Sequence, residues 1–264
     1  MDIFKNLKRY YSYYRDIRSF DKDSFIHTLN FSIDDDRAAL EGKSLIPLIS
    51  KALDFAFKNE IEEKGIKNSF YFNIFPGEPY RILSGIVNTI KPKSLLDIGT
   101  FTGMSSRVML DYSDQLTEIK TFDLIKWNKF KDTHLSIEDF ENRKFSQDLV
   151  DLSSKFIFDK YLNLFNDSEI IYADGPKDGK FEYELCKNIS NSNLENKKRY
   201  LILDDIKFLN MVKLWRYIES PKIDISSFGH YLGTGIVDIS KGLKINKRAF
   251  NKNIKHVLKR NEIF

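Results

Sequence analysis

The sequence is poor in cysteine, in long apolar runs and in excess charge of one sign. Cys186 is the one cysteine in 264 residues, so an internal disulfide is excluded. No run approaches the ~18 apolar residues of a membrane span, and the first 20 residues are too charged for a secretory signal. The 42 Lys and Arg residues face 38 Asp and Glu residues and form no basic stripe, which argues against a nucleic-acid partner. We therefore expect a cytoplasmic protein without a membrane span.

Predicted strands and helices alternate through most of the chain. The first third, residues 1–75, lacks strand signals and predicts a helical extension, in which the apolar stripe over 45–61 suggests a homodimer face. Residues 76–264 predict a second, larger domain. Its predicted strands lie at 94–99, 118–124, 144–152, 168–175, 199–205, 222–230 and 233–240. This pattern indicates an α/β fold, a doubly wound, mostly parallel seven-stranded sheet with an antiparallel last strand.

A glycine-containing turn follows the first predicted strand, in the stretch LLDIGTFTGMSS (residues 95–106). Gly99 would let the backbone turn, and Gly103 would allow close approach at the entry of the next helix. The motifs G-x-G-x-x-G and G-x-x-x-x-G-K-[ST] are both missing, and the pattern found is Asp-x-Gly-x-x-x-Gly, beginning at Asp97. Asp123 ends the next predicted strand, where a carboxylate can accept from two ribose hydroxyls; the alternative is a solvated strand-end acid. Together these features predict a nucleoside-binding site.

LLDIGTFTG followed by TFDL resembles the cofactor site of class I S-adenosylmethionine-dependent methyltransferases, over about residues 76–240. The resemblance implies a Rossmann-like methyltransferase fold with S-adenosylmethionine as cofactor. Gly99 and Gly103 would line its methionine end, and Asp123 would hold the ribose. Asp97 would organise the loop and reach the cofactor ammonium, directly or through water. Further cofactor contacts are expected from Thr100, Ser105, Tyr80, Asp148 and Asp174. For the adenine edge, Asp151 competes with Asp148.

Three acids end two further predicted strands: Asp174, Asp204 and Asp205. At one edge of a sheet these carboxylates would repel one another unless a positive charge lay between them, so the sequence predicts Mg²⁺ or another divalent cation. DGPK and LDD resemble the metal-binding segments of catechol-type O-methyltransferases, and the chain also resembles macrocin-type sugar O-methyltransferases. In the catechol group an Asn is common where this chain has Asp205. The resemblance implies that all three acids are metal ligands.

Two residues are candidate bases for a hydroxyl acceptor. Lys177 lies three residues after Asp174, and a dication together with partial desolvation would lower its pKa. His230 lies between the last two predicted strands, where a loop could fold over a substrate.

These features predict a metal-dependent O-methyltransferase acting on a small hydroxylated molecule, such as a sugar, a glycosylated metabolite or a catechol-like phenol. An enzyme of the cephalosporin-hydroxylase-associated type and a glycan-modifying methyltransferase are alternatives. A different class is a non-catalytic assembly partner that retains the fold. Intact Gly99, Gly103 and Asp123 argue against that class, because a degenerate copy should lose them.

Overall fold

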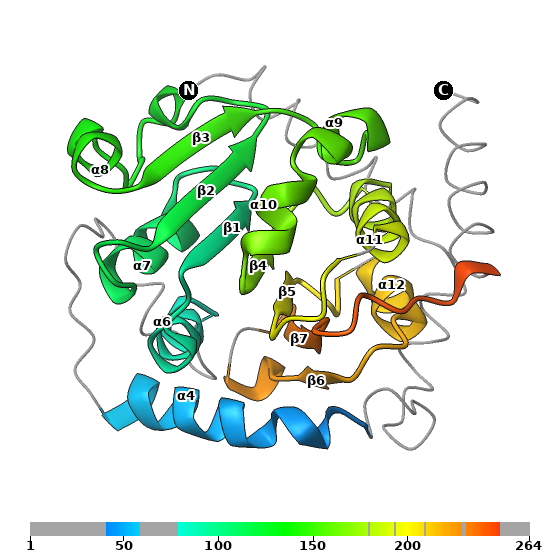
Figure 1. The fold of residues 1–264 in the computed structure, drawn as a ribbon. Coiled ribbons are helices and arrows are strands. Elements are labelled where there is room, and N and C mark those ends of the chain that lie inside the picture. The colour runs from blue at the N-terminus through cyan, green and yellow to red at the C-terminus, as the bar shows by residue number, and fades with distance from the viewer. Residues whose placement is uncertain are drawn as a thin grey trace, which may run out of the picture.

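Seven strands form one sheet in the order β3-β2-β1-β4-β5-β7-β6 (Figure 1). The structure is a computed structural model, and it describes residues 41–58, 79–178, 180–192, 194–208, 210–228 and 231–248. The strands are β1 (Ser94–Ile98), β2 (Glu118–Asp123), β3 (Phe145–Leu149), β4 (Ile170–Ala173), β5 (Tyr200–Asp204), β6 (Lys222–Asp224) and β7 (Thr234–Asp238). Strands β1 to β5 pair in parallel, whereas β7 is antiparallel to both β5 and β6. The predicted fold class is confirmed, including the antiparallel last strand.

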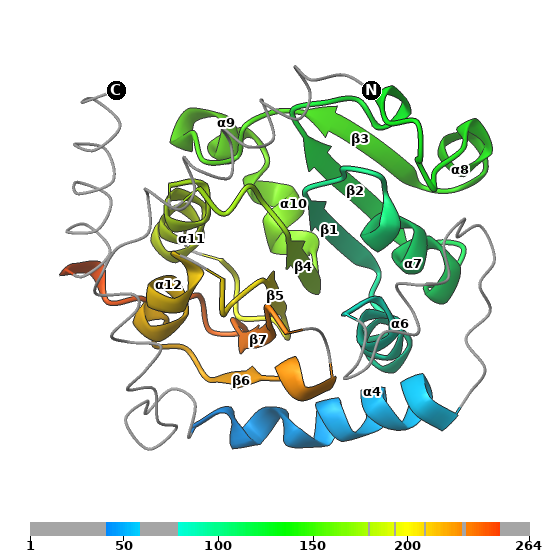
Figure 2. The ribbon, with the colours of Figure 1, turned by 180° about the vertical axis from the view of Figure 1, so that it is seen from behind.

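Helices cover both faces of this sheet, as Figure 1 and the reverse view in Figure 2 show. The α-helices are α4 (Ile46–Lys58), α6 (Pro79–Ile90), α7 (Met104–Tyr112), α8 (Ile137–Asn142), α9 (Lys155–Lys160), α10 (Leu162–Asp167), α11 (Phe181–Asn191) and α12 (Met211–Tyr217). Short 3₁₀ turns are η2 (Gly42–Leu45), η3 (Trp127–Lys129) and η4 (Ser226–Phe228). Because side chains alternate along a strand, each face has its own apolar core. One core packs α9 to α12, including the fully buried Cys186, and the other packs α4, α6 and α7.

The described part of the N-terminal extension belongs to the second core. Leu45 and Ile49 are buried there, and a side chain on Gly85 of α6 would lie 2.1 Å from the carbonyl oxygen of Ala52. Two residues of the stripe behind the homodimer prediction thus pack within the chain, whereas Ile46 and Phe57 are exposed. The homodimer stays a prediction, because the same helical period serves packing inside a chain as well as between chains.

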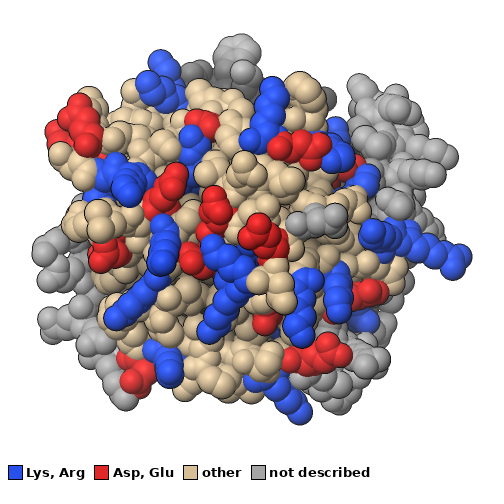
Figure 3. Space-filling view, viewed as in Figure 1, with Lys and Arg blue, Asp and Glu red and all other residues tan. Residues whose placement is uncertain are grey.

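The surface mixes charges of both signs on the face drawn in Figure 3, where Lys and Arg alternate with Asp and Glu. Within the described residues, no helix has the length and apolar character needed to cross a membrane.

Candidate active site

The turn after β1 adopts the conformation that its glycines predict. Gly99 has φ +106°, and a Cβ there would lie 2.1 Å from the backbone carbonyl oxygen of Asp174. Gly103 has φ +81° at the N-cap of α7, where a Cβ would meet the side chain of Leu135 at 2.5 Å. Both positions favour glycine for backbone and steric reasons. The turn therefore lies directly against the segment that follows β4.

Asp97 anchors this turn from beneath. Its carboxylate is fully buried and accepts hydrogen bonds from the hydroxyls of Ser105 (2.9 Å), Thr121 (3.1 Å) and Ser106. Burial raises the pKa of Asp97 from 3.8 to about 7, although the three hydroxyls act in the opposite direction. Asp97 thus joins β1, β2 and the first turn of α7. Ser105, which is expected to contact the cofactor, donates its hydroxyl hydrogen bond to Asp97. A cofactor contact from Ser105 or from Asp97 stays a prediction.

Replacing Asp97 by asparagine should change how stability depends on pH. The folded state holds the Asp97 proton up to about pH 7 and the unfolded state loses it near pH 4, so wild-type stability should fall as pH rises between these values. The amide of the substituted side chain cannot titrate. We expect the free energy of unfolding of D97N, relative to wild type, to rise by about 2–3 kcal/mol from pH 5 to pH 8.

Urea unfolding at pH 5, 6, 7 and 8 measures this difference. D159N is the control, because Asp159 is an exposed partner of Lys155 on α9. If the free energies of unfolding of D97N and wild type change in parallel with pH, burial does not raise the pKa of Asp97 as assigned.

Asp123 ties the glycine turn to the end of β2. One carboxylate oxygen accepts from the backbone N–H of Phe101 (2.8 Å), and the other accepts from Leu124 (2.6 Å) and Ile125 (3.0 Å). Phe101 itself has φ +45°, which is an uncommon backbone conformation for a residue other than glycine. The hydrogen bond from its N–H to Asp123 helps to hold this conformation. Lone pairs remain on the carboxylate, so this fixed position is compatible with the predicted ribose contact.

Gln147 of β3 is a site residue that sequence reasoning missed. Its amide nitrogen donates to Thr100 Oγ1 (3.0 Å) and to the carbonyl of Ile125 (3.2 Å), and its oxygen accepts from the N–H of Trp127 (3.0 Å). Thr100 also bonds the hydroxyl of Thr121 at 2.7 Å. One amide therefore connects the turns that follow β1 and β2. No local signal distinguishes a glutamine in a strand as a site residue. The sequence predicts a cofactor contact from the neighbouring Asp148 instead.

Asp148 points to the opposite face of β3 from Gln147, because the two are consecutive strand residues. Its carboxylate lies 2.7 Å from Lys120 Nζ and accepts from the phenol of Tyr161. Burial, assisted by that bond, raises the pKa of Tyr161 to about 12. Asp151, the competing candidate, accepts from the N–H of Ser153 at 2.9 Å. The adenine-edge role of either acid remains a prediction.

Replacing Gln147 by leucine should weaken cofactor binding about tenfold, because three hydrogen bonds of roughly 0.5–1.5 kcal/mol each hold the two turns. Calorimetric titration with S-adenosylmethionine measures the effect. D148N is the neighbouring variant and reports separately on the adenine-edge prediction. Unchanged affinity in Q147L would show that these turns need no such connection.

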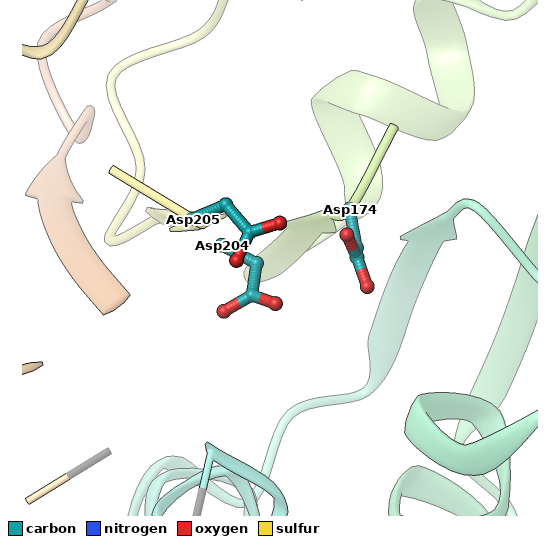
Figure 4. Close-up of side chains that lie close together, drawn as sticks. All are labelled: Asp174, Asp204 and Asp205. Carbon is teal, nitrogen blue, oxygen red and sulfur yellow. The ribbon is translucent and has the colours of Figure 1, made fainter. Parts of the chain in front are cut away.

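Three carboxylates converge where β4 and β5 end. Asp174 follows β4, Asp204 ends β5, and Asp205 comes next with φ +59°. They offer oxygens that all lie within 4.8 Å of one another, and Figure 4 shows them reaching into one region from two neighbouring segments. Asp204 is buried and accepts from the hydroxyl of Thr234 at 3.1 Å. The side chains that the sequence predicts together are therefore together.

Lys177 supplies a positive charge to this acid cluster. Its Nζ lies 2.7 Å from Asp174 Oδ1, 3.1 Å from the carbonyl of Gly175 and 3.8 Å from Asp205 Oδ2, with only 5% of the residue exposed. Burial alone would lower the pKa of Lys177, but Asp174, Glu182 and Asp205 outweigh it and raise that pKa. The lowered pKa expected from sequence is tied to a bound dication and stays a prediction; in the chain by itself, the direct contact with the carboxylates raises the pKa of Lys177.

Glu182, at the start of α11, supports the turn that carries Lys177. Its Oε1 accepts from the N–H of Lys177 at 2.8 Å, and Lys177 has φ +54°. Its Oε2 is buried without a hydrogen-bond partner, and burial raises the pKa of Glu182 despite the nearby lysine. Sequence reasoning missed this residue, since nothing in the local pattern distinguishes it from other helix-start acids.

The donor set of the acid cluster fits a divalent cation. Three carboxylates and one ammonium leave a charge of −2 (three of −1 and one of +1), and carboxylate oxygens suit hard cations. The ammonium of Lys177 already provides a positive charge there.

The hydroxyl of Tyr172, on β4, is buried with no hydrogen-bond partner. Burial raises the pKa of Tyr172, and the negative charges of Asp204 and Asp174 raise it further.

Two further candidate residues are Tyr80 and His230, whose roles stay predictions. Tyr80 of α6 is partly buried and packs against the second core, near Tyr172. His230 lies outside the described residues.

Comparison with solved structures finds methyltransferases with weak overall likeness. A methyltransferase from Podospora anserina, PaMTH1 bound to SAH, is 11% identical with a TM-score of 0.45, covering 72% of this chain and 87% of that one. The O-methyltransferase TomG from Streptomyces achromogenes, in complex with SAM, is 12% identical with a TM-score of 0.42, covering 72% and 95%. An O-methyltransferase from Bacillus cereus in complex with SAH is 12% identical with a TM-score of 0.40, covering 78% and 91%.

No protein-family model matches the chain, and no curated protein matches it. Since the TM-scores lie below 0.5, the function proposed below rests on the residues of this chain.

Proposed function

We propose that the chain is an S-adenosylmethionine-dependent O-methyltransferase that uses a divalent cation to methylate a hydroxyl of a small molecule. The proposal depends most on one observation: the glycine turn and the acid cluster touch. Gly99 approaches the backbone of Asp174 so closely that a Cβ would lie 2.1 Å from its carbonyl oxygen. A nucleoside-type cofactor on the turn would thus lie beside any cation held by the cluster, at the edge where open α/β sheets bind ligands.

The glycine turn and Asp123 form the cofactor half of the proposed site. Gly99 leaves no side chain between the turn and Asp174, so the methionine end of the cofactor can approach the acid cluster. Asp123 is oriented by three backbone N–H groups and would accept from the ribose hydroxyls. The exposed apolar side chains of Leu124, directly after β2, and of Leu149, the last residue of β3, would border the adenine.

Asp174, Asp204 and Asp205 form the metal half and would hold Mg²⁺ or a similar cation. When bound, such a cation lowers the pKa of an acceptor hydroxyl and orients it. The residues of the chain do the rest: Thr234 fixes Asp204, and Lys177 or His230 would accept the acceptor's proton. Lys177 can do so only after it releases its proton, which its contact with Asp174 opposes.

Calorimetric titration of S-adenosylmethionine, with and without Mg²⁺, tests the proposal. We expect cofactor binding in both conditions and magnesium-dependent turnover on a panel of diols, sugars and catechols. Binding without metal-dependent turnover would favour another methyltransferase mechanism. Absence of cofactor binding would favour the non-catalytic assembly role.

A further inference from the structure

We propose that Lys177 is the built-in counter-ion of the acid cluster, and that a divalent cation must displace its ammonium group from Asp174 in order to bind. The inference rests on the metal-binding role proposed above for this cluster. It assigns to Lys177 a control over metal affinity that is separate from any part in proton transfer.

The contact between Lys177 and Asp174 occupies an oxygen that the cation would need. Nζ lies 2.7 Å from Asp174 Oδ1 in a place where only 5% of the residue is exposed. It is also 3.8 Å from Asp205 Oδ2, so it faces two of the three carboxylates. A dication among oxygens that lie within 4.8 Å of one another would meet the ammonium at short range and be repelled.

The way Lys177 is held allows such a displacement. Its backbone is fixed at φ +54° by the bond from its N–H to Glu182, whereas its ammonium is held through a flexible four-carbon stem. The side chain can swing away from Asp174 while the turn stays in place.

Competition has a consequence that a purely supporting lysine would not have. Removing the ammonium should strengthen metal binding, since the cation no longer has to displace it. The same change should destabilise the metal-free protein, because the three carboxylates then face one another without the ammonium group that contacts Asp174. Added metal should recover that loss.

Mn²⁺ titration of the full chain, followed by the electron paramagnetic resonance signal of free Mn²⁺, tests the proposal. Lys177→Met keeps most of the apolar stem and should bind Mn²⁺ about tenfold more tightly than wild type. Lys180→Met is the matched control: it makes the same charge change three residues away at an exposed position and should stay within about twofold. The proposal is overturned if K177M binds Mn²⁺ no more tightly than wild type while Asp204→Asn loses Mn²⁺ binding. That result would still support the metal site itself.

Absence of Mn²⁺ binding in both wild type and K177M would overturn this inference and the proposed metal dependence together. A second measurement uses only wild-type protein, in case K177M does not fold. Acetylation of Lys177, followed by mass spectrometry, should proceed several-fold faster with Mn²⁺ bound, because displacement exposes Nζ. Equal or greater protection of Lys177 in the presence of Mn²⁺ would contradict displacement.

Discussion

Replacing Asp204 by asparagine is expected to lower kcat/KM for methyl transfer by at least about a thousandfold, which corresponds to about 4 kcal/mol. Asp204 is the most buried of the three clustered acids, and its loss leaves two carboxylates to hold a cation. The amide oxygen of asparagine can still accept from Thr234, so the fold should be preserved. Initial rates of S-adenosylhomocysteine formation, together with Mn²⁺ affinity, measure the effect.

Asp238→Asn is the matched control for this substitution. Asp238 lies on β7 beside Tyr200, at the opposite end of β5 from Asp204. Its substitution should leave rate and metal affinity within about twofold. A D204N variant that keeps both Mn²⁺ binding and turnover would remove the acid cluster from the mechanism.

Replacing Gly99 by alanine is expected to be the most damaging change to the glycine turn. A Cβ at this position would lie 2.1 Å from the carbonyl oxygen of Asp174, and the residue has φ +106°. The clash is with backbone, so β1 or the turn after β4 must move. We expect a loss of at least about 3 kcal/mol in the free energy of unfolding and, in any folded fraction, loss of cofactor binding.

Gly242→Ala separates steric clash from backbone strain. Gly242 also has positive φ, +82°, but nothing lies within 4 Å of a Cβ placed there. This variant should lose only about 1 kcal/mol and bind S-adenosylmethionine normally. Urea unfolding and calorimetry compare the two. Equal losses in G99A and G242A would show that the contact between the turn and Asp174 is unimportant.

Features carried by a single segment could be predicted from the sequence. Strands such as β1 and β5 are buried on both faces and therefore read as short apolar runs. Their carboxyl ends carry Gly99 and Asp204, and the rule that parallel strands end at one edge was enough to bring the acid cluster together.

Features that depend on distant segments could not be predicted in the same way. Gln147 acts through bonds to backbone groups of the turn after β2, which no local pattern reveals. Lys177 also faces Asp205, which is 28 residues away in sequence and 3.8 Å away in space. The stripe on α4 shows a periodicity that cannot distinguish packing on α6 from packing on a second copy.

The measurement that tests the central claim most directly is the NMR signal of the S-methyl carbon of ¹³C-methyl-labelled S-adenosylmethionine bound to the chain, recorded with Mg²⁺ and then with Mn²⁺. If a cation lies in the acid cluster beside the cofactor, paramagnetic Mn²⁺ should broaden the methyl signal strongly in wild type and leave it sharp in D204N. A bound cofactor whose methyl signal stays sharp with Mn²⁺ in wild type would contradict the account.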